Sequence, residues 1–123
     1  MSTYILAIDH VQIAAPEGCE EKARMFYGEI LGLEELEVPL GLRDRASCWF
    51  RCGQLQVHIG IQQDFQASKK AHVAFLTTRI DGLREVFQLH GITTVDDSDL
   101  PGGRRFFTED PWGNQLEFFE RTS

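Results

Sequence analysis

The sequence predicts an α+β protein made of two tandem βαβββ modules. An alternating strand pattern, an amphipathic helix and further short strand-like runs occur in one order, and the same order then occurs again. A polar stretch, residues 62–70, separates the two runs and is the predicted linker. The chain of 123 residues can bury one core shared by two small modules, but not two independent domains. We therefore expect one domain over residues 1–123, with module 1 at about 5–61 and module 2 at about 71–120.

In the first half, residues 5–14 alternate between apolar and polar side chains and predict a strand. Residues 17–31 predict a helix, because apolar residues recur at helical spacing, and Gly32 is a suitable stop. Two strand-like runs follow at 47–51 and 54–61.

The second half repeats this order. Residues 71–77 predict a strand, and residues 81–90 a helix that ends before Gly91. Strand-like runs follow at 92–95, 104–109 and 115–120. The segment Asp110-Pro-Trp-Gly-Asn114 predicts the turn before the last of these, since Pro presets φ and Gly and Asn accept positive φ.

Four predicted strands carry a metal-ligand residue type on the face opposite their apolar side chains, because successive strand residues point to opposite faces. These residues are His10, His58, His72 and Glu117. In each half, one such residue lies near the beginning and the other near the end. A sheet with all four on one face would gather them into a site.

A single His on a strand is more often a structural residue, but four ligand types at repeated positions favour a metal site. Imidazoles with one carboxylate suit one divalent ion, with Zn, Fe, Ni, Co and Mn all compatible. His58 is either a ligand or a group that faces the substrate or supports a ligand. A Glu117 that leaves the metal transiently would be the catalytic base.

The candidate substrate pocket comes from the same strand parity. Gln12 and Gln56 share the ligand-bearing face, where they either orient substrate or form a hydrated polar wall. Arg104 and Arg105 are expected on opposite faces of a strand, so one of them, with Arg105 the candidate, can meet an anionic substrate.

Composition narrows the function classes. The net charge of −7 argues against nucleic-acid binding, which needs a basic patch. No apolar run approaches the roughly 20 residues that span a bilayer, and the N-terminus lacks the basic region of a signal peptide, so we expect a cytoplasmic protein. The odd cysteine count, Cys19, Cys48 and Cys52, predicts free thiols in that compartment.

Four segments carry a family resemblance: Asp9-His-Val-Gln-Ile-Ala-Ala-Pro16, Phe26-Tyr-Gly-Glu-Ile-Leu-Gly-Leu33, Ala71-His-Val-Ala-Phe75 and Asp110-Pro-Trp-Gly-Asn-Gln-Leu-Glu-Phe118. With them the sequence resembles the vicinal oxygen chelate superfamily, which includes glyoxalase I, bleomycin and fosfomycin resistance proteins and extradiol dioxygenases. The resemblance implies a rolled mixed sheet, or cup, with helices on its outer face, in a homodimer.

In that family the ligands come from the first and last strands of each module, which correspond to His10, His58, His72 and Glu117. His58 stands where bacterial glyoxalase I has a glutamate that takes part in proton transfer. Fosfomycin-type enzymes and extradiol dioxygenases use a triad of two His and one Glu, and that triad is present.

The function expected from the residues and the resemblance is a metal-dependent enzyme whose small oxygenated substrate chelates the metal through neighbouring oxygens. The reaction types that remain open are lyase or isomerase, ring-cleaving dioxygenase and thiol transferase. The alternative is a metal-free protein that sequesters a small molecule or drug, of the bleomycin-resistance type.

Overall fold

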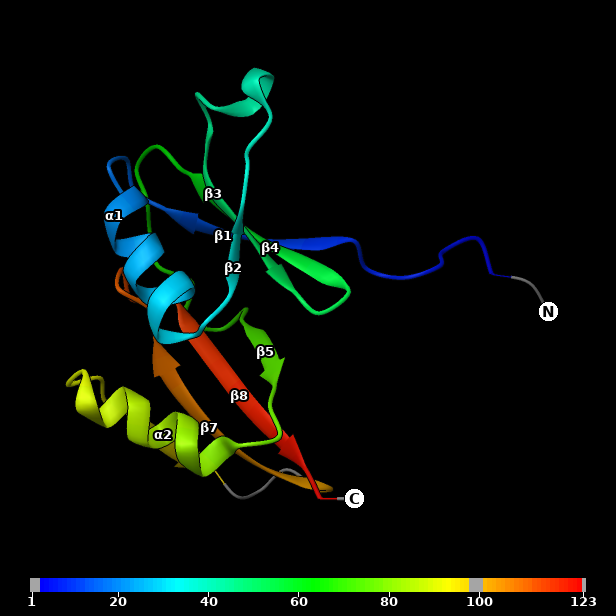
Figure 1. Cartoon of the computed structure of the whole chain (residues 1–123), viewed down its shortest axis with the longest axis vertical. Helices are drawn as coiled ribbons and strands as arrows, with labels where there is room; N and C mark the ends of the chain where they lie inside the picture. The colour runs from blue at the N-terminus through cyan, green and yellow to red at the C-terminus, as the bar shows by residue number, and fades with distance from the viewer. Residues whose placement is uncertain (1–2, 98–100, 123) are drawn as a thin grey trace. The chain divides into compact units, whose positions relative to one another are not determined.

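The computed structural model describes residues 3–97 and 101–122. The chain divides into two compact units, Met1–Phe65 and Gln66–Ser123, called unit 1 and unit 2 below. Each unit combines helical structure with a four-stranded mixed sheet (Figure 1). The predicted α+β class with two βαβββ modules is confirmed. No helix within the described residues has the length and apolar character that crossing a membrane requires.

Unit 1 has the strand order β1-β4-β3-β2, with β1 parallel to β4 and the other neighbours antiparallel. Its elements in chain order are β1 (His10–Ala15), α1 (Glu20–Ala23), the π-helix η1 (Arg24–Ile30), β2 (Glu34–Leu36), the short 3₁₀ turn η2 (Leu40–Leu42), β3 (Ala46–Cys52) and β4 (Leu55–Ile61).

Unit 2 repeats this topology with the order β5-β8-β7-β6, in which β5 is parallel to β8 and the other neighbours are antiparallel. Its elements are β5 (Val73–Leu76), α2 (Ile80–Leu89), β6 (Val95–Asp97), β7 (Gly103–Glu109) and β8 (Gln115–Arg121). The first and last strands of each unit are therefore a parallel pair at one edge of its sheet, which places the residues at their starts side by side.

The predicted single helix over residues 17–31 begins later and changes type. It starts as α1 at Glu20 and continues as the π-helix η1, in which the Leu31 N–H bonds the carbonyl of Phe26. The wider π-helical turn brings Phe26 and Tyr27, which are consecutive, into the core together. The predicted stop is confirmed, because Gly32 has φ +77°.

Three strand boundaries were wrong, and one strand was not predicted. The strand expected at 71–77 is β5, Val73–Leu76, so His72 lies just before it. The first strand begins at His10, not at residue 5, because β4 begins at Leu55 and offers no partner to the residues before Asp9. The strand expected at 92–95 is β6, Val95–Asp97, because the Ile92 N–H bonds the end of α2. The edge strand β2 has no alternating apolar pattern and was missed.

The core of each unit lies between its sheet and its helix. In unit 1 it includes Phe26, Tyr27, Phe50, Val57 and Ile59. In unit 2, Phe87 of α2 packs against Phe106 of β7 and Phe118 of β8, with ring centroids 5.8 and 5.4 Å apart. The opposite face of each sheet carries the polar residues discussed below.

All three cysteines are free thiols, as predicted, and Cys19 and Cys48 are buried. Burial raises the pKa of the Cys48 and Cys52 thiols. Because the thiolate is the reactive form, we expect slow modification of the native protein by a disulfide reagent near neutral pH, with Cys52 modified first. In denaturant all three should react at the rate of a model thiol. Fast modification of Cys48 in native protein would contradict the assigned burial.

Candidate metal centre

His10, at the start of β1, is oriented by its neighbour in the sequence. A side-chain oxygen of Asp9 lies 2.9 Å from His10 Nδ1. A carboxylate on one ring nitrogen fixes the proton there and leaves the lone pair on the other, as in many metal-bound histidines. The His10 ring is 44% exposed. It therefore presents Nε2 as a donor to an incoming ion.

His72 lies immediately before β5 and faces an acceptor with each ring nitrogen. Its Nδ1 is 3.0 Å from the Lys70 carbonyl oxygen, and its Nε2 is 2.9 Å from Glu117 Oε1. A neutral imidazole has one N–H and can satisfy only one of these oxygens. Both contacts are satisfied when the ring is doubly protonated, or when a cation occupies the position of the Nε2 proton.

Glu117 of β8 is a buried carboxylate with a cationic neighbour, Arg105. Besides the His72 contact at Oε1, its Oε2 lies 3.4 Å from Arg105 Nη1. The guanidinium of Arg105 also donates to Asp97 at 3.2 Å and lies over the Phe107 ring at 5.0 Å. A buried charge needs such partners. Arg105 can keep Oε2 while Oε1 turns to a metal ion.

His58 of β4 lies between two other rings. Trp49 is stacked on it with centroids 3.8 Å apart and planes at 2°, and His10 is stacked with centroids 4.2 Å apart and planes at 16°. His58 Nε2 also lies 2.8 Å from Gln56 Oε1. Burial lowers the pKa of His58, with a further contribution from the charge of His10.

The stacking of His10 on His58 limits what the two rings can do together. Each imidazole nitrogen donates in the plane of its own ring, at about 2.0–2.1 Å for Zn²⁺. Nearly parallel rings have their lone pairs in separate planes, so both cannot point at one ion without a rotation. In the observed arrangement, the His10 side chain is partly exposed and the His58 ring lies against it.

The two sheets hold their ligand types at equivalent positions. In unit 1, His10 aligns with Gln56, two residues before His58 on β4. In unit 2, Val73 aligns with Leu116, so that His72 precedes the aligned stretch by one residue, close to Glu117. The repeat inferred from residue order thus extends to strand register.

The predicted pocket residues lie on the same faces. Gln12 of β1 aligns with His58 of β4, and the Gln12 side chain passes over Gly60, where an added Cβ would come within 2.6 Å of the Gln12 amide nitrogen. Gln56 is bonded to His58, and Arg105 to Glu117. As predicted, Arg104 points to the other face and bonds Asp81 at 2.7 Å.

The structure thus pairs His10 with His58 in unit 1 and His72 with Glu117 in unit 2. Taken by itself, neither unit gathers three or more His, Cys, Asp or Glu side chains into a metal site within the described ranges. The sequence analysis missed Asp9, Trp49 and Asp97. Adjacency to His10 was the signal for Asp9, whereas Trp49 needed the β3–β4 register and Asp97 the β6–β7 register.

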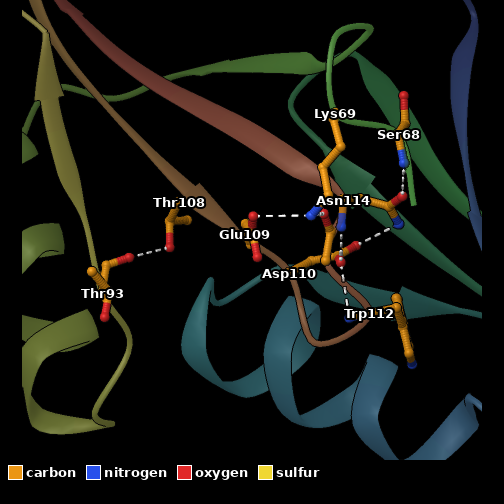
Figure 2. Close-up of polar contacts among 9 residues, drawn as sticks. Ser68, Lys69, Thr93, Thr108, Glu109, Asp110, Trp112 and Asn114 are labelled. Carbon is orange, nitrogen blue, oxygen red and sulfur yellow. Dashed lines mark hydrogen bonds and ion pairs between the residues drawn. The ribbon is translucent and has the colours of Figure 1, made fainter. Parts of the chain in front are cut away.

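The turn before β8 is braced by hydrogen bonds of Asp110 and Asn114 (Figure 2). Asp110 accepts bonds at Oδ1 from the Trp112 and Asn114 main-chain N–H groups, at 3.0 and 2.9 Å, and at Oδ2 from the Asn114 amide. Asn114 Oδ1 in turn accepts from the Ser68 N–H at 2.9 Å. The segment leading to His72 is therefore tied to the turn leading to Glu117.

A tandem βαβββ chain with His, His and Glu on the polar faces of its sheets defines a class, and comparison with known proteins identifies it. The family model for the Glyoxalase/Bleomycin resistance protein/Dioxygenase superfamily matches residues 7–118. The chain belongs to this superfamily. No curated protein matches the sequence significantly.

Among solved structures, one assigned to the glyoxalase family, from Bacillus anthracis, is 48% identical, with a TM-score of 0.94, over 99% of this chain and 100% of that one. A lactoylglutathione lyase from Agrobacterium tumefaciens is 21% identical, with a TM-score of 0.74, over 96% of each chain. An antibiotic binding protein from a Streptomyces species is 18% identical, with a TM-score of 0.76, over 98% of this chain and 100% of that one. The last two show a shared fold only.

Proposed function

We propose that this protein binds one divalent metal ion through His10, His72 and Glu117 and acts on a small substrate that chelates the ion through neighbouring oxygens. The ligands come either from one chain or from two copies in a homodimer. The observation that carries the proposal is the His72–Glu117 contact, in which both ring nitrogens face oxygen acceptors. A cation bound at Nε2 would lie between the ring nitrogen and Glu117 Oε1, so that both ring nitrogens would have a partner.

The set of ligands in this proposal is narrower than the four residues expected from the sequence. His10 and His72 each have Nδ1 beside an oxygen, which leaves Nε2 as the donor. His58 instead has Nε2 beside Gln56 and both ring faces covered. We assign His58 the role of orienting His10 by ring stacking.

The residues divide the chemistry among them. A bound divalent ion supplies Lewis-acid stabilisation of negative charge that develops on substrate oxygens. Glu117, held at Oε2 by Arg105, presents Oε1 at the site, and a proton taken from the substrate could reside on that oxygen while Oε1 is not bound to the metal. Trp49 and Phe107 occupy the corresponding places beside His58 and Glu117 in the two β-sheets, where each supplies an apolar ring next to the polar side chain.

Metal analysis of protein purified without a histidine tag tests the proposal. After chelator treatment and incubation with Zn²⁺, Mn²⁺, Fe²⁺, Co²⁺ or Ni²⁺, we expect one equivalent of at least one ion per chain. Loaded protein is then assayed with methylglyoxal and thiols, with catechols under air, and with fosfomycin and thiols. Protein that binds none of these ions would refute the metal assignment.

The second candidate is a metal-free small-molecule binder. A cavity of about 620 Å³ in unit 2, within the usual size range of ligand sites, favours it, as does the similarity in fold to an antibiotic binding protein. A binder retains its ligand after chelator treatment, whereas the enzyme loses turnover. The two candidates therefore separate in one experiment.

A further inference from the structure

Unit 2 has an open cavity of about 620 Å³ beside Glu117. Its apolar wall is formed by Ile92, Val95 and Phe107. In the β7–β8 register Phe107 lies directly opposite Glu117. A residue of the cavity wall is therefore adjacent to the proposed metal ligand. The volume is within the range of small-molecule sites and exceeds what a chelating group of a few atoms fills.

The cavity exists because β6 is short. Its pairing with β7 ends at Val95 and Phe107, so Thr108 and Glu109 have no β6 residue opposite them. The segment before β6 is held to β7 through the Thr108 hydroxyl, which donates to the Thr93 carbonyl at 2.6 Å (Figure 2). The space between the two segments is fixed at both ends.

Most polar groups around the cavity already have protein partners. Glu109 is paired with Lys69 Nζ at 3.0 Å, and both oxygens of Asp110 accept bonds within the turn (Figure 2). Within residues 3–97 and 101–122, the Gln115 side chain makes no hydrogen bond to the protein. Gln115 is thus a neutral donor and acceptor that remains for a ligand.

The spacing between Gln115 and Glu117 also indicates the size of the ligand. It precedes Glu117 by two positions on β8, so the two side chains share a face and their Cα atoms are about 7 Å apart. A molecule that reaches Gln115 from the metal site therefore has a body of about one or two rings beyond its chelating oxygens.

The charges near the cavity disfavour an anionic occupant. The carboxylates of Glu109 and Asp110 line the cavity. Two more carboxylates, those of Glu117 and Asp97, contact Arg105 nearby. Against these carboxylates stand the cations Lys69 and Arg105, each already paired. The whole chain carries −7. The cavity therefore attracts uncharged apolar groups and repels carboxylates.

We infer that this cavity receives an uncharged, apolar or aromatic substituent of the substrate, with Gln115 hydrogen-bonded to a neutral polar atom on it. The inference rests on the proposed function for the statement that the rest of the molecule chelates a metal. It names a substrate class with a neutral ring-sized substituent and excludes substrates whose substituent carries carboxylates.

The test uses metal-free protein, so that it does not depend on the metal site. Fluorescence titration with neutral 2-naphthol and anionic 2-naphthoate compares two probes with the same ring system. We expect one naphthol per chain and at least about tenfold weaker binding of naphthoate, a difference of about 1.4 kcal/mol. Glu109→Gln should reduce this discrimination roughly 2–5-fold, as expected for an exposed charge.

Val95→Trp fills the cavity from an exposed edge position and should weaken naphthol binding about tenfold or more. Leu89→Trp, at an exposed site on α2 outside the cavity, is the matched control and should leave the affinity unchanged. Equal binding of naphthoate and naphthol, or unchanged affinity in Val95→Trp, would overturn the inference. Naphthol binding without any metal binding would instead refute the proposed function alone.

Discussion

Glu117→Gln protein loses stoichiometric metal binding, with an affinity at least about 100-fold below that of the parent, because changes to supporting residues alone cost 10–100-fold. Glutamine keeps the shape of the side chain but removes the charge that a divalent ion and Arg105 both require. Equilibrium dialysis or calorimetry with Zn²⁺ and Mn²⁺ measures the effect. Glu109→Gln, an exposed carboxylate on the adjacent strand β7, is the control and should bind metal normally.

The same measurement on His58→Gln tests the division of roles. Because His58 is stacked between Trp49 and His10 and bonded to Gln56, we expect its loss to weaken metal binding by no more than about tenfold. The metal affinity of His72→Gln should decrease as much as that of Glu117→Gln. If His58→Gln binds metal as poorly as these two variants do, the site has four ligands and the supporting role is wrong.

Phe106→Ala destabilises the protein by about 3–5 kcal/mol, the usual cost of truncating a fully buried aromatic residue. Phe106 has no exposed surface and contacts the rings of Phe87 and Phe118 at the centre of unit 2. Urea unfolding, followed by far-UV circular dichroism, gives the change in the free energy of unfolding.

The next residue along β7 provides the control. Phe107 is only partly buried and belongs to the polar face, so Phe107→Ala should cost clearly less stability, while it weakens naphthol binding in the cavity. The two variants therefore separate the core face of β7 from its ligand face. Equal losses of stability would contradict the assignment of faces.

Much of what the sequence could predict came from the alternation of side chains between the two faces of each strand. The alternation around Val57 and Ile59 placed His58 on the opposite face, and the alternation around Leu116 and Phe118 did the same for Glu117. Such patterns are reliable because one residue of slip would expose the whole apolar face. Helix ends were also predictable where a glycine adopts positive φ, as at Gly32 and Gly91.

Long-range register and ring orientation were not predictable. The stack of Trp49, His58 and His10 depends on which residues of β1, β3 and β4 align, and no local pattern encodes that alignment. The His72–Glu117 contact likewise joins residues far apart in the chain, as does the Ser68–Asn114 contact beside it. These contacts underlie the proposed division, in which His58 supports His10 and His72 binds the metal.

A crystal structure of the metal-loaded protein, with anomalous data collected at the absorption edge of the metal, tests the central claim most directly. We expect one anomalous peak per site at about 2.0–2.2 Å from Nε2 of His10, Nε2 of His72 and Oε1 of Glu117. The His58 ring should remain stacked and outside bonding distance. A peak bound by other residues, or no peak near Glu117 in protein that contains one equivalent of metal, would contradict it.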